Sequence, residues 1–240
     1  MVALLLPLAA VAQVRFDVAS IRPNSQPVPF ERDGQISLTH DTLRMRAVSV
    51  RACVAFAYGV STSQIAGPAS LSQRTYDITA KAGANPSDTN IRLMLRTLLA
   101  ERFGLRVHLE QKEMRGYILT VLSSPRVPAS FHPSTTAGEM VRHNSASGTT
   151  ARNITMPQFA AFLTGPLNAP VADQTGLSGE YDLTLDFTPY VDLAAKPFDL
   201  PSADYVLNAA LKGELGLQLS ARRSEFRVVV VDHVGELTPN

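Results

Sequence analysis

The 240-residue chain has a single cysteine, Cys53, so no disulfide can form within it. Cys53 lies in the apolar stretch "VRACVAFAYG" and is expected to be a small buried side chain. The chain also has no hydrophobic run of the roughly 20 residues that a membrane-spanning helix requires. These absences exclude a disulfide scaffold and an internal transmembrane segment.

The chain has little net charge and no basic run. Its formal charge is +1, so no overall property indicates binding to nucleic acid. The charge is unevenly spread, because residues 1–122 carry 14 Lys+Arg against 9 Asp+Glu (+5) and residues 123–240 carry 8 against 12 (−4). Such a dipole permits head-to-tail association, although two ordinary solvated surfaces are the usual explanation.

The sequence motifs of common catalytic and cofactor sites are missing. There is no H-E-x-x-H, no G-x-S-x-G, no P-loop and no G-x-G-x-x-G. We therefore predict no metal ion, no nucleotide and no other cofactor.

The N-terminal stretch "MVALLLPLAAVAQ" has the length and the small-x-small ending of a secretory signal peptide. It lacks the positively charged residues that usually precede the apolar core, and a packed N-terminal strand or helix is the alternative. Cleavage before Gln13 would make residues 1–12 a signal peptide and the mature protein secreted or periplasmic.

The two halves of the chain resemble each other. "VSVRACVAFAYG" (48–59) aligns with "ITMPQFAAFLTG" (154–165), which predicts two helices with Ser49 and Thr155 as N-caps and Gly59 and Gly165 as stops. "TYDITAKA" (75–82) matches the alternating strand "EYDLTLDF" (180–187).

Further helices and strands follow in both halves. Helices are predicted to begin near Ser87 and Ser202 and to end at Gly104 and Gly216. After each, "LRVHLEQKEMRGYILTV" (105–121) and "LQLSARRSEFRVVVVDHV" (217–234) predict two strands joined by a charged turn. The segments 16–23, 36–48 and 148–154 are expected to be lead-in strands.

The fold class that these patterns predict is α+β. We expect two tandem repeats of a strand-helix-strand/helix-strand-strand unit, with mixed or antiparallel sheets and helices on one face. The first unit covers residues 13–122 and the second 148–240, and the Pro-, Ser- and Thr-rich residues 123–147 form a linker or long loop.

Six ordered blocks carry a resemblance to a known family: "FDVASIRPN", "VRACVAFAYGVSTSQIAGP", "RTYDITAKA", "LRTLLAERFGLRVHLEQKEMRGYILTV", "PVADQTGLSGEYDLTLDFTP" and "VVVVDHVGELTPN". The chain resembles a soil-bacterial secreted protein family classed as a domain of unknown function. It departs from that family in having no Trp after Gly67-Pro68. The resemblance implies export and the double-unit fold, and no activity. More loosely, the order of elements is similar to the short N-terminal domain of secretins and TonB-dependent receptors, which is a docking and assembly module.

Few residues are candidates for a functional site. The weak candidates are Asp173, Asp182, His132 and His143, each with a plain structural alternative such as a turn residue or the polar side of a strand. The densest positive group is a candidate interaction surface, for which a solvated helix face is the alternative, and consists of Arg92, Arg96, Arg102 and Arg106.

These observations favour a non-catalytic exported protein of the bacterial envelope or extracellular space. It would act by protein–protein contact, with a protein partner or by self-association, through exposed strand edges or complementary charge. The alternatives are a hydrolase-type enzyme with a site in the crevice between the two units, and a carrier of a small molecule or lipid.

Overall fold

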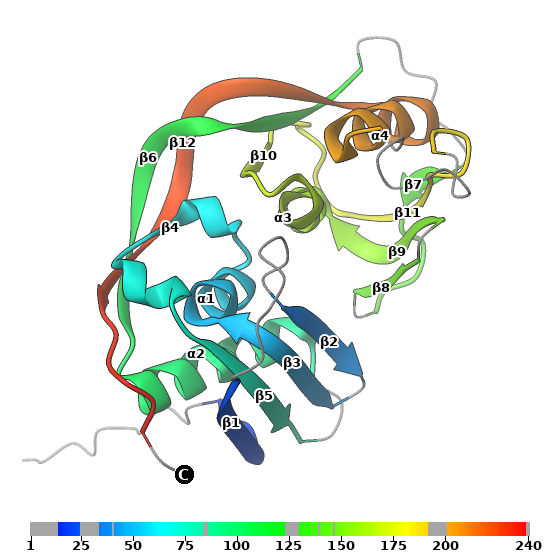
Figure 1. The fold of residues 1–240 in the computed structure, drawn as a ribbon. Helices are drawn as coiled ribbons and strands as arrows, with labels where there is room; N and C mark the ends of the chain where they lie inside the picture. The colour runs from blue at the N-terminus through cyan, green and yellow to red at the C-terminus, as the bar shows by residue number, and fades with distance from the viewer. Residues whose placement is uncertain are drawn as a thin grey trace, which may run out of the picture. The chain divides into compact units, whose positions relative to one another are not determined.

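A computed structural model of the chain describes residues 14–24, 34–39, 41–83, 86–122, 130–138, 140–145, 147–191 and 201–238. In this part of the chain the fold is α+β, with four helices and three four-stranded sheets (Figure 1). The expected signal peptide, residues 1–12, lies outside the described residues, as do residues 123–129 of the expected linker.

The chain divides into two compact units. Unit 1 comprises residues 1–58, 68–106 and 231–240, and unit 2 comprises residues 59–67 and 107–230. Each unit is therefore built from segments that are separated in the sequence, whereas the sequence predicted two contiguous units. The sequence order alone would place residues 59–67 in unit 1 and residues 231–240 in unit 2, whereas each belongs to the other unit.

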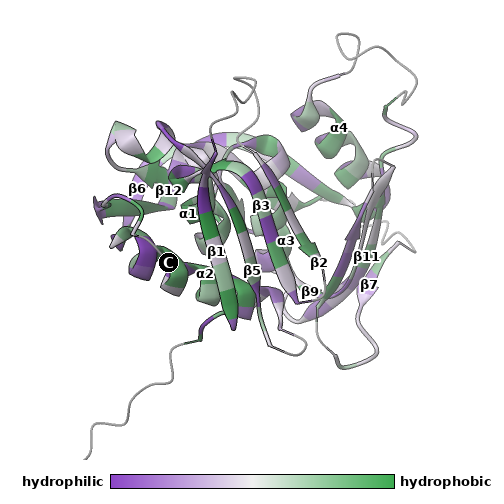
Figure 2. Cartoon of the chain, turned by 60° about the horizontal axis from the view of Figure 1, so that its bottom comes forward, coloured by the Kyte–Doolittle hydropathy of each residue, from purple (hydrophilic) through white to green (hydrophobic). Residues whose placement is uncertain are grey.

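Unit 1 contains sheet A, which is antiparallel and has the strand order β1-β5-β3-β2. Its strands are β1 (Val18–Asn24), β2 (Gln35–Thr39), β3 (Thr42–Ser49) and β5 (Thr75–Lys81). The strands alternate between buried apolar and polar residues. The buried ones include Ile21, Leu43, Met45 and Ile78, and the sequence neighbours of each are polar. Figure 2 shows this interleaving of hydrophobic and hydrophilic residues along the strands. One face of sheet A therefore joins the core and the other is polar.

Two helices complete the core of unit 1. In α1 (Val50–Tyr58), the Ser49 hydroxyl accepts a hydrogen bond from the Ala52 amide at 3.1 Å, so Ser49 is the predicted N-cap. Ser87 caps α2 (Asp88–Phe103), and Gly104 ends it in a left-handed conformation with φ 58°. Both predicted helices are confirmed, because capping residues and apolar spacing agree at each end.

Unit 2 contains sheet C, which is also antiparallel, in the order β7-β11-β9-β8. Its strands are β7 (Phe131–Pro133), β8 (Val141–Asn144), β9 (Gly148–Thr155) and β11 (Glu180–Asp186). The short strands β7 and β8 lie in the stretch that the sequence predicted to be a linker or loop. Their brevity explains this difference, since three or four residues show no periodicity.

The helices of unit 2 are α3 (Met156–Leu167) and α4 (Ala203–Ala210), and α4 continues into a wider turn over Leu211–Leu215. Thr155 caps α3 with a capping box, as predicted. The predicted stop at Gly165 is wrong: α3 continues to Leu167, and Asn168 takes the left-handed position instead. Asparagine tolerates this conformation nearly as well as glycine.

Sheet B is mixed, with the order β10-β6-β12-β4. The short strands β4 (Ile65–Ala66) and β10 (Val171–Asp173) pair in parallel with β12 (Leu217–His233) and β6 (Arg106–Val121), respectively. The prediction of a charged turn in the middle of β6 and of β12 is therefore wrong, because each is one continuous strand.

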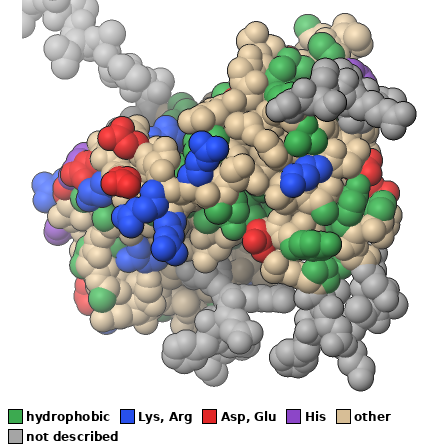
Figure 3. All heavy atoms as spheres, turned by 90° about the horizontal axis from the view of Figure 1, so that it is seen from above, with side chains coloured by type: hydrophobic (Ala, Val, Ile, Leu, Met, Phe, Trp, Pro, Cys, Tyr) green, Lys and Arg blue, Asp and Glu red, His purple; other side chains and the backbone are tan. Residues whose placement is uncertain are grey.

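The charged residues in the middle of β6 and β12 lie on exposed strand positions. Lys112 Nζ lies 2.8 Å from Glu110 Oε2, and Arg223 Nε lies 3.4 Å from Glu113 Oε1. Figure 3 shows a face of the molecule on which acidic and basic side chains are intermingled. The charged side chains at these positions face solvent, and residues 108–115 and 220–227 contain no Pro, Asn or Gly that would start a turn.

Candidate functional site

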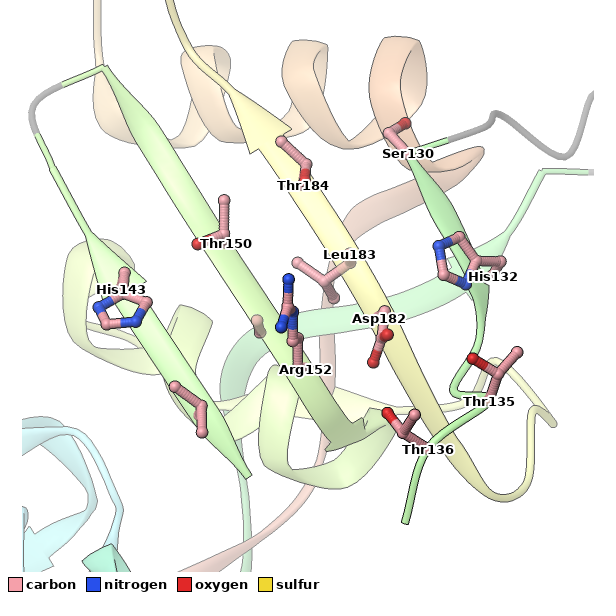
Figure 4. Close-up of a pocket in the computed structure, with 12 residues that line it drawn as sticks. Ser130, His132, Thr135, Thr136, His143, Thr150, Arg152, Asp182, Leu183 and Thr184 are labelled. Atoms are coloured by element: carbon pink, nitrogen blue, oxygen red, sulfur yellow. The ribbon is translucent and has the colours of Figure 1, made fainter. Parts of the chain in front are cut away.

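The main candidate site is a cavity of about 730 Å³ on the polar face of sheet C. Figure 4 shows its side chains on four neighbouring strands, in the spatial order β7, β11, β9 and β8. The lining residues are Ser130, His132, Thr135, Thr136, Val141, His143, Thr150, Ala151, Arg152, Asp182, Leu183 and Thr184. Three of the four weak candidates from the sequence, His132, His143 and Asp182, therefore lie in one cavity, and all of its lining belongs to unit 2.

A β-bulge in β9 positions the centre of this cavity. The register between β9 and β11 shifts so that Arg152 and Asn153 together lie opposite Asp182. Asn153 has φ 54°, in the left-handed region, which turns the strand at this point. Arg152 is exposed, and in Figure 4 it lies near the middle of the cavity, between Asp182 and His143.

The carboxylate of Asp182 holds the bulge in place. Its Oδ1 accepts hydrogen bonds from the Ser134 hydroxyl at 2.6 Å and from the Asn153 amide at 3.0 Å. The Ser134 hydroxyl and the Asn153 amide hold the pKa of Asp182 below its usual value, and the charges of His132 and Arg152 add to this effect. Asp182 is therefore an ionised brace between two strands, and its Oδ1 is already engaged.

The two histidines lie on opposite sides of the cavity. His132 is directly opposite Asp182 in the β7–β11 register, and its Nδ1 lies 3.1 Å from the carbonyl oxygen of Pro133. His143 is opposite Thr150 in the β8–β9 register. Since β7 and β8 are the two outer strands of the sheet, three strand spacings of about 4.8 Å separate them. Among the described residues, no three His, Cys, Asp or Glu side chains are grouped closely enough to bind a metal ion.

Asp173 lies elsewhere, at the end of β10. Its Oδ1 accepts hydrogen bonds from the Thr175 amide at 2.9 Å and the Thr175 hydroxyl at 2.7 Å. Gly176 and Gly179 follow with φ 70° and 92°. The interpretation of Asp173 as the first residue of a turn is confirmed, and this residue does not join the other candidates at the cavity on sheet C.

The four arginines of the predicted interaction surface belong to unit 1, and three of them have partners within it. The Arg92 side chain donates to the carbonyl of Phe56, and that of Arg96 donates to the carbonyl of Ala57 at 2.9 Å. Each guanidinium also stacks on an aromatic ring. The Cζ atom of Arg92 lies 4.5 Å from the centroid of the Phe56 ring, and that of Arg96 lies 4.2 Å from the centroid of the Tyr58 ring. These two arginines thus satisfy carbonyl groups at the C-terminal end of α1.

The other two arginines of that group lie at the end of α2 and the start of β6. Arg102 donates to the carbonyl of Thr238 from Nη2 at 2.7 Å, which ties the C-terminal segment to α2. Arg106, the first residue of β6, is exposed. The contacts of the group therefore differ, since Arg92 and Arg96 contact the end of α1, Arg102 contacts the C-terminal segment and Arg106 begins β6.

The sequence did not identify the central residue of the cavity, Arg152, or the hydroxyl groups around it. Arg152 is a single basic residue in a threonine-rich strand, and nothing in its spacing marks it. Its importance comes from the register of β9 with β11, which a single sequence does not give.

A comparison with protein-family models matches residues 51–234 to the family described as "Protein of unknown function (DUF3738)". These 184 residues are more than half of the chain. The chain belongs to the DUF3738 family. No curated protein and no solved structure matches this DUF3738 chain significantly. In the described residues, no helix is long and apolar enough to span a bilayer.

Proposed function

We propose that this DUF3738 protein is a non-catalytic binding protein that acts by protein–protein contact, and that the cavity on sheet C holds an acidic segment of its partner. The observation that carries this proposal is the position of Arg152. It is an exposed guanidinium at the centre of a polar cavity, and it lies within 4 Å of no carboxylate among the ion pairs of the described residues, although its charge acts on Asp182. A guanidinium in this setting is a natural partner for a carboxylate, which it binds through two parallel hydrogen bonds.

The other lining groups support binding rather than catalysis. Ser130, Thr135, Thr136, Thr150 and Thr184 offer hydroxyl groups that donate and accept hydrogen bonds. Asp182, the one carboxylate among the lining residues, is engaged in bracing the bulge. Neither imidazole is hydrogen-bonded to a hydroxyl in the described structure, so the nucleophile–base pair that hydrolysis would need is not assembled.

The edge of sheet C gives an extended partner segment a second attachment. β8 is an outer strand and pairs with β9 along one side. Its other side carries backbone groups to which a strand can add, and Val141, 46% exposed, offers an apolar contact there. A segment added to β8 would present its side chains next to His143 and Arg152.

Replacing Arg152 with glutamine is expected to weaken partner capture by about tenfold or more, because a charge-assisted hydrogen-bond pair is lost. A photo-crosslinking amino acid at position 143 would trap proteins from the envelope fraction and the medium of the producing cells. Quantitative mass spectrometry would then compare the wild-type background with Arg152→Gln. The proposal requires one protein with an acidic segment to be crosslinked strongly by the first and weakly by the second.

Arg222→Gln is the matched control, since Arg222 is an exposed arginine on β12 that does not line the cavity. This variant should crosslink the same protein as efficiently as wild type. An identical set of captured proteins for Arg152→Gln and wild type would refute the proposal.

We further propose that the protein is exported, to the periplasm or the medium, after cleavage before Gln13. The support is the apolar stretch 2–12 with its small-x-small ending. Mass spectrometry of the protein recovered outside the cytoplasm is expected to give an N-terminus at Gln13. Full-length protein recovered solely from the cytoplasm would contradict this prediction.

We also propose that the two halves arose by duplication of one α+β module. The support is an offset of 106 residues between two strands, since β3 and β9 are both eight residues long and begin at Thr42 and Gly148. The left-handed residues Ala47 (φ 52°) and Asn153 (φ 54°) have the same offset. The relation to the short N-terminal domain of secretins and TonB-dependent receptors stays a prediction.

A further inference from the structure

A second cavity, of about 430 Å³, lies on the polar face of sheet A in unit 1. Its lining residues are Ser20, Arg22, Arg44, Met45, Arg46, Asp77, Ile78 and Thr79. Three of them are exposed arginines, and they come from two different strands, β1 and β3. This concentration of guanidinium groups was not apparent from the sequence, because Arg22 is far along the chain from the other two.

The register of sheet A brings the three arginines to one place. Arg22 lies directly opposite Asp77 across the β1–β5 pair, and Arg44 lies opposite Thr79 across the β3–β5 pair. Arg46 lies in the bulge of β3 that faces Asp77. With strands about 4.8 Å apart and residues i and i+2 about 6.7 Å apart, the three side chains begin within about 12 Å of each other. Long, flexible arginine side chains can converge on one ligand from these positions.

The charges at this cavity do not balance. Three guanidinium groups and one carboxylate leave a net charge of +2 among the lining residues (3 − 1 = 2). Asp77 Oδ1 already accepts hydrogen bonds from Asn24 Nδ2 at 2.8 Å and from the Ala47 amide at 2.8 Å. None of the three arginines forms an ion pair with a described residue.

The cavity on sheet C has the same framework with different charge. Its Asp182 braces a left-handed bulge residue just as Asp77 does, and Arg152 occupies the place of Arg46. The remaining positions correspond as follows: Ser20 to Ser130, Arg22 to His132, Arg44 to Thr150 and Thr79 to Thr184. Two positions that are arginine on sheet A are thus neutral or titratable on sheet C. The face of sheet A is suited to a more strongly anionic ligand.

We infer that the polar face of sheet A is a binding site for a phosphate-bearing ligand. A phosphate group at neutral pH carries up to two negative charges and has several acceptor oxygens, which fits three guanidinium donors better than a single carboxylate does. Ser20 and Thr79 also line the cavity, and their hydroxyls can donate further hydrogen bonds. This site is separate from the sheet C cavity and does not depend on the function proposed for it.

Inorganic pyrophosphate is the first probe, and isothermal titration at low salt measures its affinity for the full-length protein. Arg44→Gln and Arg46→Gln are each expected to lower the affinity by about tenfold, and the double variant by about 100-fold. Binding of the wild type should weaken as sodium chloride is raised, because exposed charges are screened. Arg222→Gln, which removes an exposed arginine on β12 that does not line this cavity, is the matched control and should bind pyrophosphate like wild type.

A second arm distinguishes a free phosphate compound from a lipid headgroup. Co-flotation of the protein with phosphatidylcholine vesicles, with and without phosphatidic acid, shows whether the site binds the phosphate of a lipid headgroup at a membrane surface. Binding to pyrophosphate or to phosphatidic acid vesicles, with loss in the Arg44→Gln/Arg46→Gln variant, supports the site and identifies the source. The inference is overturned if wild type binds neither probe, if the double variant binds as wild type does, or if Arg222→Gln abolishes binding. Circular dichroism at increasing urea concentration confirms that each variant is folded.

Discussion

Replacing Gly116 with alanine is expected to lower the free energy of unfolding of unit 2 by about 3 kcal/mol, because β6 has no room for a side chain at this position. A Cβ atom on Gly116 would lie 2.5 Å from Cζ of Phe226 and 2.7 Å from the carbonyl oxygen of Pro170. Phe226 is 5% exposed, and the Pro170 carbonyl accepts a hydrogen bond from the Tyr117 amide at 2.8 Å. Relief of the clash therefore requires a buried ring and a backbone segment to move together. Urea unfolding followed by circular dichroism measures the effect.

Gly165→Ala is the matched control for this prediction. Gly165 lies inside α3, and an added Cβ would have no neighbour within 4 Å. Alanine there is expected to stabilise the protein by about 0.5–1 kcal/mol, since it favours the helix. Phe226→Leu should restore part of the stability lost in Gly116→Ala, by shortening the ring, and the contact with Pro170 should account for the rest. A Gly116→Ala variant as stable as wild type would show that Phe226 and Pro170 do not pack closely against Gly116.

The helices and strands that were predicted correctly are those whose signals lie in residues close together in the sequence. Ser49, Ser87 and Thr155 each begin a helix because a hydroxyl can accept a hydrogen bond from an amide three residues later, and this spacing is visible in the sequence. Gly59, Gly104 and Gly216 each have positive φ at the predicted stops. The strands 75–81 and 180–186 show a clear period of two.

The errors concern features that depend on partners distant in the chain. The charged centres of β6 and β12 resemble turns, and they remain extended because the two strands are neighbours in sheet B. The divided units could not be predicted either, because β4 and β10 pair with strands from the other half of the sequence. Two- and three-residue strands carry no pattern of their own.

Only part of the candidate site could be predicted, because its arrangement also depends on strands that are distant in the chain. His132, His143 and Asp182 were chosen as residue types capable of chemistry, and the structure places them around one cavity. Their roles depend on register: Asp182 is opposite a bulge and becomes a brace, whereas Arg152, a residue that the sequence did not single out, becomes central. The arginine cluster on sheet A required the pairing of β1 with β5 to be known.

Removal of the bracing carboxylates, Asp182 and Asp77, is the other substitution from which a large loss of stability is expected. Asp182→Ala is expected to destabilise unit 2 by about 2 kcal/mol at pH 7, because the amide of Asn153, a residue 7% exposed, loses its acceptor at a bulge in the left-handed conformation. Asp77→Ala should have a comparable effect on unit 1 through the Ala47 amide. Asp182→Asn keeps an acceptor oxygen at the same place, and a smaller loss is expected. Urea midpoints at pH 7 measure all three variants.

The pH dependence of stability shows whether Asp182 and Asp77 stabilise the bulges as ionised carboxylates or only by packing. The pKa of Asp182 is lowered, first by the Ser134 hydroxyl and then by the Asn153 amide, and that of Asp77 is lowered by the Asn24 side chain and the Ala47 amide. A carboxylate whose pKa is lower in the folded state stabilises the fold above its unfolded-state pKa of about 3.9, and this contribution is lost as the pH falls through the folded-state value. Wild type should therefore lose stability below about pH 4 more steeply than the Asp77→Asn/Asp182→Asn double variant, whose amides do not titrate. If the two midpoints fall in parallel from pH 7 to pH 2.5, ionisation of these carboxylates does not hold the bulges, and the common framework of the two cavities needs another explanation.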